Sequence, residues 1–179
     1  MKILNLPHEI IITESQIKER TLELGKQITR DYSSRDLIMV GVLKGSLLFF
    51  ADLIRTVNLP VLTDFITLSS YQGSMNSSGN VKVVNDILLQ VKDRDVLIVE
   101  DIIDTGRTSK FLIDYLTTKN PGSLGICALL DKKNSRIPGY DIKIDYSGFD
   151  VPDRFLIGYG LDYEERYRNL PYIAAVKTD

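Results

Sequence analysis

Apolar residues along the chain recur at helical spacing in some segments and form short continuous runs in others. Behind Thr13, which stands three residues before Gln16 as in a capping box, apolar residues follow a helical period. We therefore expect a helix from about Thr13 to Tyr32. The apolar run Leu37 to Val42 predicts a strand, and after the polar turn Lys44-Gly45-Ser46 a second helix should begin at Leu47 and end before Asn58.

The rest of the chain continues this alternation. A helix from Arg107 to Thr118 is predicted, because apolar side chains lie on one face and Asn120-Pro121-Gly122 stops it. Further strands are expected at Val61 to Leu68, Val81 to Val84, Asp95 to Val99, Leu124 to Leu130, Ile142 to Ile144, Phe155 to Ile157 and Tyr172 to Val176. Strands that alternate with helices indicate an α/β fold, with a mostly parallel central sheet flanked by helices. No linker or repeat interrupts the pattern, so residues 1–179 are expected to form a single domain.

One segment lacks any periodicity. Ser69 to Asn80 is polar and rich in Ser and Gly. A loop of this length inside a compact domain is usually a lid, a binding loop or a disordered segment.

Composition narrows the possible classes of protein. Lys and Arg number 22 against 24 Asp and Glu, a formal charge of −2 that gives no general reason to expect binding to nucleic acid or a membrane. The single Cys excludes an intramolecular disulfide and a Cys-rich zinc site. The N-terminal segment does not resemble a signal peptide, and no apolar run approaches the length of a membrane span, so we expect a cytoplasmic protein.

The segment Val96 to Thr108 carries the candidate chemistry. A strand-like apolar run leads into the adjacent carboxylates Glu100 and Asp101, then into Asp104 and a Thr-Gly-x-Thr turn that opens a helix. Gly106 permits a tight turn and close approach of the backbone to a ligand. The N–H groups at the start of a helix favour an anion, so a monophosphate fits this turn. The paired carboxylates could accept hydrogen bonds from sugar hydroxyls or bind Mg²⁺.

A simpler interpretation treats these acids as solvent-exposed loop residues, with Asp104 as a helix N-cap. It would suffice for a single acid. It does not explain why three acids stand between a buried strand and the Thr-Gly-x-Thr turn, Thr105 to Thr108, which we call the phosphate-type turn. In a parallel sheet, moreover, ligands bind outside the carboxyl ends of the strands, where these residues would lie.

This stretch resembles the phosphoribosyl-diphosphate (PRPP) signature of the type I phosphoribosyltransferases. More of the chain resembles the hypoxanthine-guanine phosphoribosyltransferase family, in order from about Leu37 to the C-terminus. The matching segments are Val42 to Gly45, Ser70-Tyr71, Leu130-Asp131-Lys132 and Pro152 to Tyr163. The resemblance implies the type I phosphoribosyltransferase fold, with a small hood formed by the terminal regions.

The resemblance also implies the reaction and its substrates. Family enzymes transfer the 5-phosphoribosyl group of PRPP to N9 of hypoxanthine or guanine, which gives IMP or GMP and pyrophosphate in purine salvage. They use Mg²⁺ and form dimers or tetramers, so a homodimer or homotetramer is expected. The resemblance assigns Asp104 as the general base or proton acceptor near purine N7, with electrostatic support of the reaction as the alternative role. It assigns PRPP and its phosphates to Lys44, Gly45, Glu100, Asp101, Asp104, Thr105, Gly106, Arg107, Thr108 and Arg168.

The remaining implied roles concern the purine, the metal and the lid. Lys132 would donate to the 6-oxo group, and a cation without an acceptor would reject the 6-amino group of adenine. Purine contacts are implied for Lys132, Phe155, Leu156 and Asp162, metal contacts for Glu100, Asp101 and Asp162, and lid closure over pyrophosphate for Ser70 and Tyr71. The family also carries a cis peptide that corresponds to Leu43–Lys44.

The sequence is also compatible with two other functions. A regulatory RNA-binding protein that resembles the pyrimidine attenuation regulators could share the fold, although it would need a basic surface. A phosphoribosyltransferase for xanthine or adenine is the second alternative. Adenine would face the Lys132 ammonium unfavourably, whereas xanthine differs only at position 2 of the ring.

Overall fold

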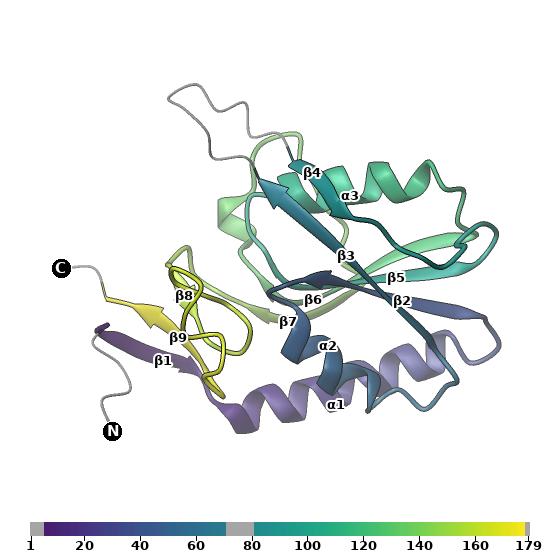
Figure 1. The fold of residues 1–179 in the computed structure, drawn as a ribbon. Helices are drawn as coiled ribbons and strands as arrows, with labels where there is room; N and C mark the ends of the chain where they lie inside the picture. Colours follow the sequence, from purple (N-terminus) through teal and green to yellow (C-terminus); the bar gives the residue numbers. More distant parts are fainter. Residues whose placement is uncertain (1–5, 71–80, 178–179) are drawn as a thin grey trace.

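The computed structural model describes residues 6–70 and 81–177. It contains two sheets and three α-helices in this part of the chain (Figure 1). The elements in chain order are β1 (His8–Ile12), α1 (Glu14–Asp31), β2 (Leu37–Leu43), α2 (Leu47–Ile54), β3 (Leu62–Ser70), β4 (Val81–Asn85), β5 (Asp95–Ile103), α3 (Arg107–Thr117), β6 (Ser123–Asp131), a 3₁₀ turn (Lys133–Ser135), β7 (Tyr146–Asp150), β8 (Leu156–Ile157) and β9 (Ile173–Val176).

The larger sheet has six strands in the order β4-β3-β2-β5-β6-β7. Strands β3 and β4 pair antiparallel, and every other neighbouring pair is parallel. This confirms the expected α/β class with a mostly parallel sheet. Because the strands run in parallel, the carboxyl ends of β2, β5 and β6 meet at the same edge of the sheet.

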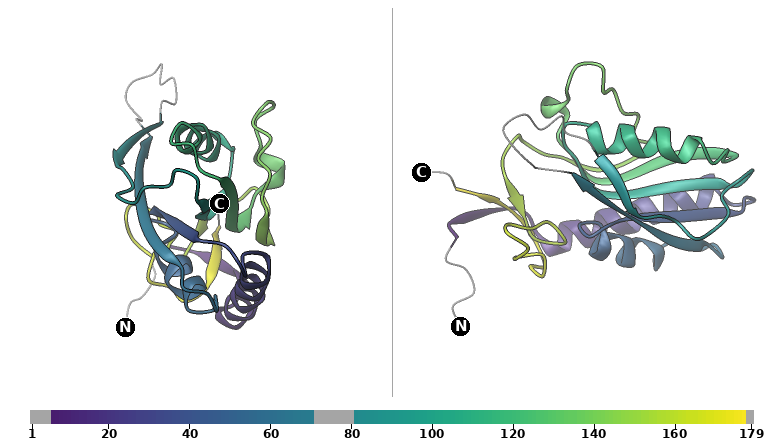
Figure 2. Two further views of the ribbon diagram at one scale, coloured as in Figure 1. Left: turned by 90° about the vertical axis from the view of Figure 1, so that its right-hand side faces the viewer. Right: turned by 45° about the horizontal axis from the view of Figure 1, so that its top comes forward.

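Helices cover both faces of this sheet (Figures 1 and 2). In β5, Leu97 and Val99 pack into the core beneath α1 and α2, whereas Val96 and Ile98 pack beneath α3. The two-residue period of a strand explains this alternation. The part of β5 from Val96 to Val99 is buried on both faces and is apolar throughout, as expected of a strand in that position.

The second sheet forms a small hood beyond the carboxyl ends of the larger one. Its order is β1-β9-β8, with antiparallel pairs, so the two ends of the chain meet in it (Figure 1). Glu9 pairs with Ala175, a contact between residues far apart in sequence. Strand β1 was not predicted, because its partner could not be identified from local pattern.

The predicted helices are confirmed to within a few residues. Thr13 is the N-cap of α1, and its side chain and backbone complete a capping box with Gln16. Strand β3 runs through Ser70, so Ser69 and Ser70 belong to a strand rather than to the predicted loop. Residues 71–80 of that loop lie outside the described residues.

The strand predicted at Ile142 to Ile144 is wrong. Pairing with β6 begins only where Tyr146 meets Cys127, and β7 runs from there. Ile142 and Ile144 instead pack, partly buried, against the core beneath α3. Their apolar alternation therefore reflects packing of an irregular segment and not a β-ladder.

Within residues 6–70 and 81–177, no helix is long and apolar enough to cross a membrane.

Candidate functional site

A cavity of about 280 Å³ lies at the carboxyl ends of β2 and β5. Its wall combines acids with the turn that opens α3. The lining residues that the sequence predicted as functional are Gly45, Glu100, Asp101, Asp104, Thr105, Gly106 and Thr108. The sheet thus brings the turn after β2 against the acidic segment of β5, although more than fifty residues separate them in sequence.

Two glycines shape this cavity by lacking a side chain. A Cβ on Gly45 would lie 1.7 Å from Oδ2 of Asp101, so only glycine lets the carboxylate approach the turn after β2. Gly106 has φ of +86°, the left-handed region that glycine adopts without strain. The peptide bond Leu43–Lys44 just before Gly45 is cis, as the family resemblance implied.

Burial changes the acidity of the paired carboxyl groups. Desolvation raises the pKa of Glu100 to about 7, against a hydrogen bond from Ser109 Oγ that lowers it. That bond measures 2.8 Å between Ser109 Oγ and Glu100 Oε1. Desolvation likewise raises the pKa of Asp101 to about 6, to which the charge of Asp162 contributes. Both groups therefore change charge between pH 6 and 7, where a bound cation would favour their ionised forms.

Asp104 and Lys132 contact each other across the ends of β5 and β6. Lys132 Nζ lies 3.1 Å from Asp104 Oδ2 and 3.7 Å from Asp153 Oδ1. The Lys132 side chain is 9% exposed, whereas that of Asp104 is 47% exposed. A nearly buried cation thus stands beside a solvent-accessible carboxylate, and the two could serve neighbouring atoms of one ligand.

Two cations predicted to bind pyrophosphate converge on one acid. Lys44 Nζ lies 2.9 Å from Glu165 Oε2, and Arg168 Nη2 lies 3.3 Å from the same oxygen. Arg168 also contacts Asp162 at 2.8 Å and donates to the carbonyl of Gly160 at 2.7 Å. The sequence singled out Arg168 in the run Tyr163 to Arg168 but not Glu165, because a Glu beside Glu164 and Arg166 in a charged run carries no distinctive pattern.

The predicted base-stacking residue lies in the hood. Phe155 is 52% exposed, and its ring meets Tyr163 edge to face with centroids 5.6 Å apart. Leu156 follows it as a buried residue of β8. A half-exposed aromatic residue held by a neighbouring ring is suited to stacking on a planar ligand.

The structure does not test the predicted contacts of three other residues, Arg107, Ser70 and Tyr71. Arg107 is the first residue of α3 and is exposed, and it does not line the cavity, although it flanks the turn. Ser70 is the last residue of β3, and Tyr71 lies outside the described residues. Their predicted contacts with phosphate or pyrophosphate stay predictions.

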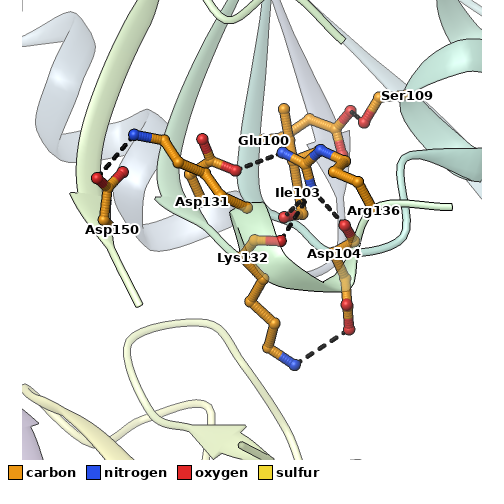
Figure 3. A network of polar contacts seen from close by, with 9 residues as sticks. Glu100, Ile103, Asp104, Ser109, Asp131, Lys132, Arg136 and Asp150 are labelled. Carbon is orange, nitrogen blue, oxygen red and sulfur yellow. Dashed lines mark hydrogen bonds and ion pairs between the residues drawn. The ribbon is translucent and has the colours of Figure 1, made fainter. Parts of the chain in front are cut away.

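A network behind the phosphate-type turn was missed from the sequence (Figure 3). Arg136 forms an ion pair with Asp131, and both side chains are largely buried, at 15% and 7% exposure. The same guanidinium donates to the backbone carbonyls of Ile103 and Asp104. Nothing in the local sequence marks Arg136, since its partners come from two strands of the sheet.

The described residues contain no preassembled metal cage of three or more His, Cys, Asp or Glu side chains. Mg²⁺ commonly uses only one or two protein carboxylates and takes its other ligands from water and substrate phosphates. Glu100 and Asp101, whose buried carboxyl groups have raised pKa values, are oxygen donors of the kind that this cation prefers. The donor set therefore fits Mg²⁺ bound together with a phosphate-bearing ligand.

Comparison with known proteins gives a consistent result. Residues 11–164 match the model of the phosphoribosyl transferase domain family. A hypoxanthine-guanine phosphoribosyltransferase from Lactococcus lactis is 46% identical over 171 residues, which cover 96% of this chain and 92% of that protein.

Solved structures agree with the sequence matches. The crystal structure of a hypoxanthine phosphoribosyltransferase from Staphylococcus aureus superimposes with a TM-score of 0.88 at 44% identity, over 94% of this chain and 91% of that one. A hypoxanthine phosphoribosyltransferase from Trypanosoma cruzi, in complex with its product IMP, gives a TM-score of 0.88 at 38% identity, over 97% and 96% of the two chains.

Proposed function

The chain belongs to the phosphoribosyl transferase family, and from this premise we propose that it is a purine-salvage enzyme that makes IMP and GMP. It transfers the 5-phosphoribosyl group of PRPP to N9 of hypoxanthine or guanine and releases pyrophosphate. The observation that carries the proposal is the cavity at the end of β5, where the buried Glu100, the partly buried Asp101 and a phosphate-type turn lie beside the Asp104–Lys132 pair.

The phosphate-type turn would bind the 5′-phosphate end of PRPP. The N–H groups at the start of α3 and the hydroxyls of Thr105 and Thr108 would bind the 5′-phosphate, and Glu100 and Asp101 would accept from the ribose hydroxyls. Thr105, Thr108 and both acids line the same cavity, which supports this division of roles.

The contact between Asp104 and Lys132 accounts for recognition of the purine. In a 6-oxopurine, O6 and N7 lie on the same edge of the ring. A donor for O6 and an acceptor for the N7 proton must therefore be neighbours, and these side chains are 3.1 Å apart. Lys132 would donate to O6 while Asp104 takes the N7 proton as N9 forms its bond to C1′. Phe155 would stack on the ring, and the Leu156 backbone would reach the edge that carries position 2.

Cations would stabilise the leaving group. As the bond from C1′ to the pyrophosphate oxygen breaks, negative charge grows on pyrophosphate, and Lys44 and Arg168 would hold it together with the backbone at Gly45. Both cations already lie within 3.3 Å of Glu165 Oε2, so they share one small region. The anion would replace that carboxylate as their partner.

We assign Mg²⁺ to Glu100, Asp101 and Asp162, together with PRPP. The cation would neutralise phosphate charge and help orient the sugar. The contribution of Asp162 to the raised pKa of Asp101 supports their proximity.

Four further features belong to the proposal. Residues 1–179 would act as one domain, since hood residues Ile173 and Ala175 share a core with β2 and β5. Two further residues, Ser70 and Tyr71, would close over pyrophosphate and so exclude water from the reaction. A homodimer or homotetramer is part of the same proposal. A cytoplasmic location is supported by the single Cys127, which is buried and unpaired.

A panel of bases tests the function. Purified protein would be mixed with PRPP, Mg²⁺ and hypoxanthine, guanine, xanthine, adenine or uracil, and nucleotide formation followed. Turnover of hypoxanthine and guanine without adenine is expected, and the xanthine reaction defines the tolerance at position 2. A folded protein that binds PRPP but converts no base would instead favour a regulatory role, which stabilisation by UMP rather than GMP would identify.

A further inference from the structure

The segment 131–137, which begins at the last residue of strand β6, packs against the turn after β5. Ile103 O accepts from Lys132 N at 3.0 Å and from Arg136 Nη1 at 2.7 Å. Asp104 O accepts from the same Arg136 nitrogen. Thr105 O accepts from Ile137 N at 3.2 Å. Three successive carbonyls are therefore held by one neighbouring segment.

This arrangement fixes the direction of the backbone donors. In a planar trans peptide the N–H group points opposite to the C=O group. Carbonyls of residues 103, 104 and 105 that point toward segment 131–137 direct the N–H groups of Asp104, Thr105 and Gly106 away from it. Those three residues line the cavity, so their donors are directed to the place where a phosphate would bind.

Arg136 is itself held in one orientation. Its second guanidinium nitrogen pairs with the carboxylate of Asp131, and both side chains are largely buried (Figure 3). A guanidinium spreads its N–H donors in a fixed plane over separate nitrogens, whereas the three donors of an ammonium share a single nitrogen. Arg136 can therefore link the end of β6 to two carbonyls at the end of β5. Lys132, the neighbour of Asp131, extends from the same anchor toward Asp104.

We propose that Arg136 is a positioning residue: paired with Asp131, it orients the backbone donors of the phosphate-type turn and fixes that turn relative to Lys132. The inference rests on the proposed function for the identity of two ligand groups: the 5′-phosphate at the turn and the purine at Lys132. It assigns no contact between Arg136 and substrate. Loss of Arg136 should weaken the contribution of the 5′-phosphate to binding more than it weakens the fold.

Two variants test this role. Arg136→Lys keeps the positive charge but has one nitrogen where the guanidinium uses two, so it cannot occupy the position beside Asp131 and the position beside the two carbonyls at once. The double variant Asp131→Leu/Arg136→Met removes the buried pair together, which avoids an uncompensated buried charge. Arg20→Met is the matched control, because Arg20 also donates to two backbone carbonyls, of Ser147 and Gly148, and contacts Glu23, but joins α1 to β7.

The readout is the ratio of the dissociation constants of guanosine and GMP, which isolates the phosphate. We expect this ratio to fall about tenfold in both Arg136 variants, since about one oriented charge-assisted hydrogen bond is lost, and to stay unchanged in Arg20→Met. Inorganic phosphate provides a probe that needs no base: the amide resonances of Thr105 and Gly106 should respond to it in the wild type and respond less in the variants.

The outcomes separate this inference from the proposed function. A wild type that converts no base, but whose Gly106 amide responds to phosphate in an Arg136-dependent way, would overturn the enzyme assignment and retain the positioning role. Ratios and phosphate responses equal to those of the wild type in folded variants would overturn the positioning role. Failure of both variants to fold would also overturn it, because Arg136 would then serve the fold itself.

Discussion

The ammonium of Lys132 lies 3.1 Å from the carboxylate of Asp104, although the two residues are 28 positions apart in sequence. Lys132 follows β6 and Asp104 follows β5, and the parallel pairing of these strands brings the residues together. The contact places a donor and an acceptor beside each other, as the O6 and N7 edge of a purine requires. Several of the expected effects below depend on this pair.

Replacement of Asp104 by Asn should reduce turnover. The amide preserves the shape and a hydrogen bond to Lys132 but cannot take the N7 proton. We expect kcat for IMP formation to fall by about 10²–10⁴-fold with little change in GMP affinity. Steady-state kinetics with hypoxanthine and PRPP would measure this. Asp153→Asn, which alters the other carboxylate near Lys132, should change kcat far less, and full activity of Asp104→Asn would exclude proton transfer to this residue.

Replacement of Lys132 by Gln should weaken selection of the 6-oxo group. The amide of Gln can act as a donor or as an acceptor, so it can accept a hydrogen bond from the 6-amino group of adenine, which the Lys132 ammonium cannot. KM for hypoxanthine should rise about tenfold or more, the cost of one charged hydrogen bond. Competition of adenine with hypoxanthine gives the measurement. Lys133→Gln is the matched control, because Lys133 is exposed and pairs with Asp150; an equal effect there would argue against a specific role for Lys132.

Replacement of Gly45 by Ala should damage the site more than the fold. The added Cβ would lie 1.7 Å from Asp101 Oδ2, so the carboxylate or the turn must move. A loss of at least about tenfold in kcat/KM for PRPP is expected. Gly139→Ala offers a comparison, since its added Cβ meets nothing within 4 Å although φ is +87°. That variant should lose a little stability and keep its kinetic constants.

The buried carboxyl of Glu100 should make stability depend on pH. Its pKa is raised from 4.5 to about 7, so the folded protein holds this proton more tightly than the unfolded chain. The contribution of Glu100 to stability is therefore full below pH 4.5 and is lost as pH rises through 7. Melting temperatures of the wild type and Glu100→Gln would be recorded without ligand across this range. As pH rises, the melting temperature of the wild type should fall relative to that of Glu100→Gln. A constant difference would contradict the raised pKa.

Removal of Mg²⁺ should abolish turnover and weaken PRPP binding. The ionised forms of Glu100 and Asp101 bind the cation, so binding of PRPP with Mg²⁺ should strengthen between about pH 6 and 7, where both groups lose protons. Calorimetric titration of PRPP with Mg²⁺ and with a chelator would measure both effects. Equal PRPP affinity in the two conditions would argue against the assigned metal site.

The sequence by itself determined the elements whose signals are local. The capping box at Thr13 and Gln16 specified the start of α1, and the apolar run of β5 followed by Glu100, Asp101 and the Thr-Gly-x-Thr turn specified the strand, the turn and the chemistry. These features depend on backbone geometry within a few residues, so the order of neighbouring residues in the sequence is enough to predict them. Resemblance to a family supplied the expectation of a cis peptide at Leu43–Lys44, which the structure contains, and the purine contacts, which stay predictions.

Only the tertiary structure decided which distant residues meet. Strand β1 exists because β9 pairs with it, β7 begins at Tyr146 because its ladder with β6 begins there, and Gly45 is required because Asp101 approaches it. Arg136 finds its partners on two neighbouring strands. Such contacts arise from the packing of segments far apart in sequence, and no local pattern of residues encodes that packing.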